Sequence, residues 1–202
     1  MDWNNHVYIN LDKRGDHNTK TIKQLMKLGI TKPNRFSAIE HQHGIIGCAL
    51  SHIKVIENAI GKELPYICVF EDDIDIIEAH TLKSKVNHLI DADFDVLMLA
   101  GNNFGGTTIS EDLHKVERCY TTGAYIIKQH YYETWLKNLK QGVLLLVQSC
   151  DRVYSLDSFN HILQRQDKWY LLTPICIIQK SGYSNIENRK VDYSDLMLDY
   201  QK

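Results

Sequence analysis

The chain has 202 residues, which predicts a single domain over residues 1–202 with a core of ordinary size. Its formal net charge of -2 excludes the basic surface that binds nucleic acid or anionic lipid. The five cysteines lie far apart and form no Cys-x-x-Cys pair, so we expect reduced structural thiols. No apolar run approaches the ~20 residues of a membrane span, and the N-terminus lacks the basic and apolar regions of a signal peptide.

The first half of the sequence alternates strand and helix patterns, which predicts an α/β protein with a mostly parallel central sheet flanked by helices. The expected strands are short β-branched or apolar runs, at residues 7–11, 35–39, 66–70 and 94–100. The expected helices show apolar residues at helical spacing, near residues 16–29, 44–61 and 82–90.

The second half continues this pattern less regularly. The expected elements are a loop at 101–106, a mobile polar stretch at 107–115, a strand at 121–127, a helix at 132–139, a strand or buried turn at 142–147, and strands at 169–172 and 175–178 split by Pro174. A last helix is expected from about residue 155, with Leu156, Phe159, Ile162 and Leu163 buried.

Three carboxylates, Glu71, Asp72 and Asp73, directly follow the apolar run at residues 66–70. Because strand side chains alternate, an extended chain points Glu71 and Asp73 to one side and Asp72 to the other. Two acids at the end of a buried strand repel each other and resist desolvation, and a divalent cation compensates for both effects. Carboxylate oxygens suit Mg²⁺ or Mn²⁺, and open α/β sheets bind ligands at the carboxyl ends of their strands. The run predicts a metal site at Glu71 and Asp73, with a solvated acidic turn as the alternative.

Other chemical signals in the sequence are weaker. The first strand lacks a Gly-x-Gly-x-x-Gly, and the glycine-rich residues 101–106 follow a later strand, so they are a weak phosphate-loop signal. Cys48 and His52 are four residues apart on a predicted helix, but two ligands alone do not make a zinc site. Ser51 and His52 are adjacent, so their side chains diverge on a helix and do not form a nucleophile–base pair.

Several blocks of the sequence resemble the glycosyltransferase family 25 enzymes, which include lipopolysaccharide glycosyltransferases and collagen galactosyltransferase-like proteins. Residues 44–52 (Gly-Ile-Ile-Gly-Cys-Ala-Leu-Ser-His) resemble the family's Gly-x-x-Gly-Cys-x-x-Ser-His helix start, and residues 70–73 (Phe-Glu-Asp-Asp) resemble its Glu-Asp-Asp metal motif. Weaker blocks lie in the same order as in the family, at residues 9–14, 35–39, 122–127 and 174–179. One departure is His17, which stands where many relatives carry a second arginine.

The resemblance implies a GT-A-like fold and a metal-dependent hexosyltransferase. Such an enzyme transfers a sugar, with inversion, from a nucleotide diphosphate donor, usually UDP-linked, to a hydroxyl of a glycan or glycoprotein acceptor. That activity serves lipopolysaccharide biosynthesis or protein glycosylation. Mn²⁺ or Mg²⁺ held by Glu71 and Asp73 stabilises the charge that grows on the leaving diphosphate.

The resemblance also implies a set of substrate-binding residues, namely Asn10, Leu11, Arg14, Ser51, His52, Asp72, Gly101, Asn102 and Gln179. Three of them have structural alternatives. Arg14 is otherwise a solvated turn residue, His52 packs or caps its helix, and Asp72 orients the loop.

Inversion requires a general base that takes the proton of the acceptor hydroxyl. Asp157, within Leu156-Asp157-Ser158-Phe159, best resembles the family's Val-Asp-x-Phe position, and Asp151 is the second candidate. The structural alternative is that Asp157 only caps the last helix.

Two other functions remain open on the sequence alone. Paired acids at a strand end also serve sugar nucleotidyltransferases, and a binding module can keep a nucleotide-sugar pocket without turnover. We expect a soluble cytoplasmic protein without a nucleic-acid partner, peripheral at most to a membrane that carries the acceptor; a viral and a bacterial source both fit.

Overall fold

The computed structural model describes residues 3–184, 186–187 and 189–202. Its strands are β1 (His6–Asn10), β2 (Arg35–Ser37), β3 (Tyr66–Glu71), β4 (Ile74–Ile76), β5 (Val96–Asn103), β6 (Gly106–Thr108), β7 (Leu113–Val116), β8 (Cys119–Lys128), β9 (Trp169–Leu172), β10 (Ile177–Gln179), β11 (Gly182–Ser184) and β12 (Arg189–Val191). Its α-helices are α1 (Gly15–Lys27), α2 (Gly44–Gly61), α3 (Ala79–Leu89), α4 (Tyr132–Ser149), α5 (Leu156–Phe159), α6 (His161–Gln166) and α7 (Ser194–Leu198). Two short 3₁₀ helices are η1 (Gln129–Tyr131) and η2 (Arg152–Tyr154).

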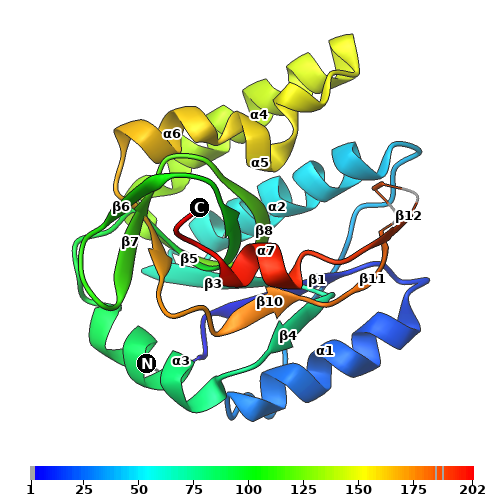
Figure 1. Ribbon diagram of the computed structural model, residues 1–202. Helices are drawn as coiled ribbons and strands as arrows, with labels where there is room; N and C mark the ends of the chain where they lie inside the picture. The colour runs from blue at the N-terminus through cyan, green and yellow to red at the C-terminus, as the bar shows by residue number, and fades with distance from the viewer. Residues whose placement is uncertain (1–2, 185, 188) are drawn as a thin grey trace.

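An eight-stranded sheet, in the order β2-β1-β3-β8-β5-β9-β7-β6, forms the centre of the molecule (Figure 1). Strand β1 runs parallel to β2 and β3, and β5 runs parallel to β9. The other pairings in this sheet are antiparallel: β8 runs against β3 and β5, and β7 runs against β9 and β6. The predicted α/β class and flanking helices are confirmed, and the parallel order expected for the first strands holds for β2-β1-β3, within a sheet that is mixed as a whole.

Helices cover both faces of the sheet. Helices α2 and α4 lie on one face, and α1, α3 and α7 lie on the other (Figure 1). Along β3, Ile67 and Val69 belong to the α2 and α4 side of the core, whereas Cys68 and Phe70 belong to the opposite side. The alternation directs the next side chain, Glu71, towards α2.

A small two-stranded ribbon brings a late segment of the chain to the end of β3. Strand β10 pairs antiparallel with β4, and Gln179 lies opposite Ile74. A second ribbon, formed by β11 and β12, follows immediately. Residues from the last quarter of the chain therefore border the acids at the end of β3.

Four expectations about the second half of the chain are wrong. The stretch at 107–115 contains parts of β6 and β7 instead of a mobile loop, and β5 continues through Gly101 and Asn102 to Asn103. The residues at 142–147 lie inside α4. The last helix is divided at Asn160, and Ile162 is 48% exposed.

All five cysteines are free thiols in the structure. Cys68, Cys119 and Cys176 are buried, as expected of structural thiols, but Cys150 is exposed at the end of α4. Within the part of the chain that the structure describes, no helix combines the length and the apolar character needed to cross a bilayer.

Candidate active site

The three acids at the end of β3 contact three different parts of the fold. Glu71 is the last residue of β3, and Asp72 and Asp73 form the turn before β4. Glu71 faces α2, Asp72 contacts α1 and β1, and Asp73 contacts β10. Each carboxylate is thus held by a different element.

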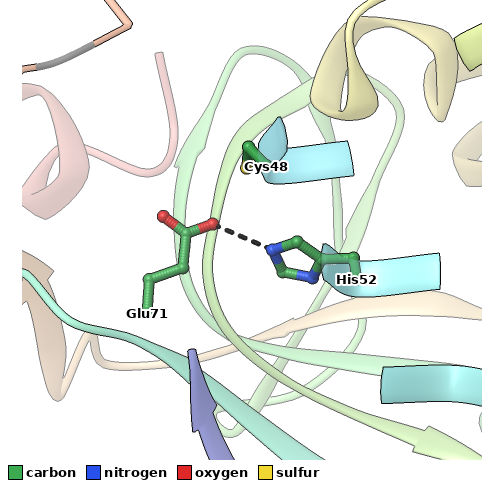
Figure 2. Close-up of side chains that lie close together, drawn as sticks. All are labelled: Cys48, His52 and Glu71. Carbon is green, nitrogen blue, oxygen red and sulfur yellow. Dashed lines mark hydrogen bonds and ion pairs between the residues drawn. The ribbon is translucent and has the colours of Figure 1, made fainter. Parts of the chain in front are cut away.

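Glu71 is held by a buried histidine. Its Oε1 atom lies 3.3 Å from His52 Nε2 and accepts a hydrogen bond from Thr122 Oγ1 at 3.3 Å. The His52 side chain is only 1% exposed, and its Nδ1 atom lies 2.8 Å from the Tyr125 hydroxyl. Figure 2 shows His52 and Cys48 on the same side of Glu71, with the second carboxylate oxygen turned away from them. His52 therefore orients Glu71 and does not merely pack its helix.

Asp72 ties the turn to the first strand and the first helix. Asn10 Nδ2 donates to its Oδ2 atom at 2.6 Å, and His17 Nδ1 lies 3.1 Å from its Oδ1 atom. Thr21 Oγ1 donates to the Asp72 carbonyl at 2.9 Å. His17, which departs from the family pattern, thus contacts an acid of the Glu-Asp-Asp motif, and the sequence did not predict this contact. Its other ring nitrogen contacts the Arg14 guanidinium.

The Asp73 carboxylate is buried beside a second negative charge. Gln179 Nε2 donates to its Oδ2 atom at 2.6 Å, but its buried Oδ1 atom has no hydrogen-bond partner among the described residues. Burial, followed by the negative charge of Glu71, raises the pKa of Asp73 to about 7. A buried oxygen without a partner, next to a second carboxylate, fits a divalent cation with hard oxygen ligands. Glu71 and Asp73 are the residues that would hold it.

Asp157 lies on α5, which packs against β8. Burial raises the pKa of the Cys48 thiol well above its usual value, and the charges of Glu71, Asp157, Asp73 and Asp72 raise it further in that order.

Asp157 also has structural contacts of its own. Its Oδ1 atom accepts hydrogen bonds from Ser155 Oγ at 2.7 Å and from the Ser158 amide at 2.9 Å, but the N-cap residue of α5 is Ser155, and Asp157 lies within the first turn. Its Oδ2 atom accepts a long contact of 3.4 Å from the Thr121 amide, where the backbone has a φ of 65°. Asp151 instead is exposed and caps η2 through the Val153 amide.

A cavity of about 290 Å³ opens beside the acids. It is bordered by the end of β1, the start of α2, the end of β3 and the β11–β12 segment. Of the predicted substrate-binding residues, those that line it are Leu11, Arg14, Ser51, His52, Asp72 and Gln179. A second cavity of about 220 Å³ adjoins it. The residues that line both are Arg14, His17, Asp72, Asp73, Gln179, Tyr183 and Ser184.

Three predicted substrate-binding residues do not line either cavity. Asn10 is 1% exposed and holds Asp72 and Arg35. Gly101 and Asn102 lie within β5, and a Cβ atom on Gly101 would lie 2.4 Å from Cys119 Sγ. Close packing accounts for this glycine without a phosphate loop.

Ser51 lines the cavity but has a clear structural role. Its hydroxyl donates to the Gly47 carbonyl at 2.7 Å and accepts from the Ile39 amide at 2.8 Å. It thereby fastens the first turn of α2 to the segment after β2. The sequence analysis missed Tyr125, Thr122 and Tyr183 as site residues. Thr122 and Tyr125 lie in the weak family block at residues 122–127, but that block did not indicate which residues contact the site.

Solved structures show the same fold. A glycosyltransferase involved in the glycosylation of the major capsid of PBCV-1 matches with a TM-score of 0.54 at 11% identity, covering 91% of this chain and 95% of that one. A197 from STIV matches with a TM-score of 0.52 at 11% identity, covering 92% of each chain. No curated protein sequence matches the chain. At such low sequence identity, these similarities establish a shared fold but do not indicate a shared substrate.

The sequence itself gives a family match. The family described as Glycosyltransferase family 25 (LPS biosynthesis protein) matches residues 15–108. This range includes the Gly-to-Ser-His block on α2 and the Glu-Asp-Asp motif at the end of β3. Residues 15–108 therefore carry the sequence pattern of glycosyltransferase family 25, which confirms the recognition made from the motifs and supports sugar transfer as the general activity.

Proposed function

We propose that this protein transfers a sugar from a nucleotide diphosphate donor, with a UDP-sugar as the expected donor, to a hydroxyl of a glycan or protein-linked acceptor. The observation that carries the proposal is the meeting of Glu71, Asp72 and Asp73 at the mouth of a cavity of about 290 Å³. The family match over residues 15–108 supports the same activity.

Glu71 and Asp73 would hold a divalent ion, Mn²⁺ or Mg²⁺. The partnerless Oδ1 atom of Asp73 and the raised pKa of this acid support that assignment. When bound, such an ion supplies Lewis-acid stabilisation of the charge on the departing diphosphate. The protein's part is to orient both carboxylates, Glu71 through His52 and Asp73 through Gln179.

The donor would occupy the cavity beside these acids. Leu11 offers an apolar wall and Arg14 a guanidinium, which suits a phosphate or a nucleobase carbonyl. Asp72, fixed by Asn10 and His17, keeps the turn in place and presents its carboxylate at the cavity edge.

Asp157 is the proposed base. As the acceptor oxygen attacks the anomeric carbon, its proton passes to the Asp157 carboxylate. The bond from the anomeric carbon to the diphosphate oxygen breaks on the opposite side, and its electron pair leaves with the nucleotide. This geometry inverts the anomeric centre.

The cytoplasmic location expected from the sequence belongs to this proposal as well. The presence of five free thiols suits a reducing compartment.

A thermal-shift screen of UDP- and GDP-sugars, with and without Mn²⁺, tests the proposal. A ligand present at 100 times its Kd stabilises the protein by about 2.7 kcal/mol, which is readily measured. We expect stabilisation by one sugar nucleotide only with Mn²⁺, followed by release of the free nucleoside diphosphate when an acceptor is supplied. Pyrophosphate release would indicate a nucleotidyltransferase, and binding without release would indicate a binding module.

Two variants sharpen the test. Asp73→Asn should abolish the Mn²⁺-dependent shift, because a neutral amide cannot balance the cation. Asp91→Asn is the matched control, since Asp91 is exposed on the segment after α3. Equal UDP affinity of the Asp73→Asn variant and the wild type in calorimetric titrations would refute the metal assignment.

A further inference from the structure

A second group of potential metal ligands lies between α2 and the end of β3. It consists of Cys48, His52 and Glu71, whose ligand atoms all lie within 4.8 Å of one another (Figure 2). This group, called here the sulfur-containing cluster, differs from the Glu71–Asp73 pair in having one sulfur, one nitrogen and one oxygen ligand. It shares only Glu71 with that pair.

The fold explains why these side chains meet. Cys48 and His52 are four residues apart on α2, so their side chains lie on one face, one turn apart. Glu71 ends β3 on the sheet face that packs against α2. Two ligands at i and i+4 on a helix, with a third from another element, form a common arrangement for a zinc site.

The distances suit a tetrahedral ion. Metal–nitrogen and metal–oxygen bonds of about 2.0–2.1 Å place two tetrahedral ligands about 3.3–3.4 Å apart. His52 Nε2 and Glu71 Oε1 are 3.3 Å apart. The cysteine sulfur, within 4.8 Å of both atoms, reaches bonding distance by a small side-chain movement.

The residues around the cluster hold its ligands in place. The Tyr125 hydroxyl lies 2.8 Å from His52 Nδ1, which leaves Nε2 directed at the cluster, and Thr122 Oγ1 donates to Glu71. Tyr125 itself packs edge-on against Trp135, with ring centroids 4.7 Å apart. A partner on the second ring nitrogen is typical of metal-binding histidines.

We propose that the sulfur-containing cluster binds a borderline-soft divalent ion, Zn²⁺ being the best match to its ligands. All three ligands line the cavity of about 290 Å³, so the fourth position of the ion faces the cavity. A thiolate and an imidazole favour Zn²⁺ over Mn²⁺, which prefers oxygen ligands. A further consequence rests on the proposed function: Zn²⁺ in this site occupies Glu71 and therefore opposes Mn²⁺-dependent donor binding.

Cobalt titration of the metal-free full-length protein tests the site directly. Co²⁺ should bind in a ratio of one per chain and give the near-ultraviolet thiolate-to-cobalt absorption together with the visible bands of a tetrahedral ion. Excess Zn²⁺ should remove both. Cys48→Ser should lose the near-ultraviolet absorption, whereas Cys150→Ser should keep it, because Cys150 is exposed at the end of α4.

A second variant separates a metal site from a structural cluster. Tyr125→Phe keeps the aromatic ring but removes the hydroxyl that fixes His52, so Co²⁺ affinity should fall by about 10–100-fold. Circular dichroism and thermal melts of each metal-free variant establish that it is folded. Absence of the thiolate band in the wild type, or its persistence in Cys48→Ser, overturns the proposal and leaves the cluster as a hydrogen-bonded support for Glu71.

The Asp73→Asn variant keeps this inference independent of the proposed function. It should retain the thiolate–cobalt absorption while losing Mn²⁺-dependent UDP binding. If UDP binding survives and the cobalt absorption still requires Cys48, the donor-metal assignment fails and the present site stands. In the wild type, Zn²⁺ should weaken UDP binding, and Cys48→Ser should relieve that effect.

Discussion

Asp157 uses one carboxylate oxygen for its own helix and has the other near the strained backbone of Thr121. We predict that Asp157→Asn retains UDP-sugar affinity, since an asparagine oxygen still accepts from the Ser158 amide and the donor does not depend on the base. Sugar transfer should fall by about 10²–10⁴-fold, as expected on loss of a general base. Calorimetric binding and steady-state transfer measurements check the two halves of this prediction.

The control for that variant is Asp151→Asn. Asp151 is exposed, and its contact with the Val153 amide only caps η2, so transfer should be nearly normal. A reversed outcome would move the base to Asp151. If neither variant affects transfer, the base is another residue.

The raised pKa of Asp73 predicts a pH-dependent stability of the metal-free protein. The folded state holds the Asp73 proton up to a pH of about 7, whereas the unfolded chain releases it near pH 4. The folded state binds more protons over this window, so the contribution of Asp73 to stability falls as the pH rises through it. Asp73→Asn removes this titration. The melting temperature of the variant minus that of the wild type should therefore increase as the pH rises from about 4 to about 7.

Melting curves in the presence of a chelator, at several pH values, measure this difference directly. Comparing variant with wild type at each pH cancels the titration of other groups, such as the buried His6 and His114. A difference in melting temperature that does not change with pH would contradict the assigned burial of the Asp73 carboxylate.

At the scale of the element, the first turn of α2 packs closely against the segment after β2. A Cβ atom on Gly47 would lie 2.5 Å from the Ile39 carbonyl oxygen, which belongs to the backbone and cannot rotate away. We predict that Gly47→Ala lowers the free energy of unfolding by about 1–3 kcal/mol, in line with overpacking. Urea denaturation measures this change.

Gly61→Ala is the matched control on the same helix. Nothing lies within 4 Å of a Cβ atom at this position, so the free energy of unfolding should stay constant or rise slightly. Equal destabilisation by both changes would mean that the helix, and not the contact with Ile39, decides the outcome.

The elements that the sequence predicted well carry regular patterns. Helix α2 and strand β3 have continuous apolar spacing and clear ends, and the structure places both as expected. The stretch at 142–147 was wrongly predicted to be a strand or buried turn for two reasons. Leu144 and Val147 are apolar but more than half exposed on α4, and Gly142, a residue type that often ends a helix, lies inside this one against the Phe159 ring. Beyond α5, the buried Asn160 accepts a hydrogen bond from Trp135 at 2.8 Å, and the regular helix is broken there.

Strand β6 escaped prediction for a different reason. All three residues of β6 are exposed, so it lacks the apolar alternation by which a strand is recognised. Its place at the edge of the sheet explains that polarity.

For the molecule as a whole, the sequence predicted the acids and not their partners. Glu71, Asp72 and Asp73 form a contiguous motif, but Thr122 contacts Glu71 and Tyr125 contacts His52 from β8, which the fold inserts between β3 and β5. Strand order across a sheet depends on packing among distant segments, and no local pattern in one sequence records it. Gln179 was predicted as a site residue only through the family resemblance, because its partner Asp73 lies 106 residues earlier in the sequence.

That contact has a consequence for the order in which the molecule is built. The side-chain amide of Gln179 donates to Asp73. The backbone N–H of Gln179 donates to the sulfur of the fully buried Met197 at 3.2 Å. A chain emerging from the ribosome presents α2 and β3 long before β10 and α7. The first half can then adopt its local structure while Asp73 still lacks its amide partner. Under the proposed function, donor binding then waits for the final stage of synthesis, although every acid of the motif is made in the first half.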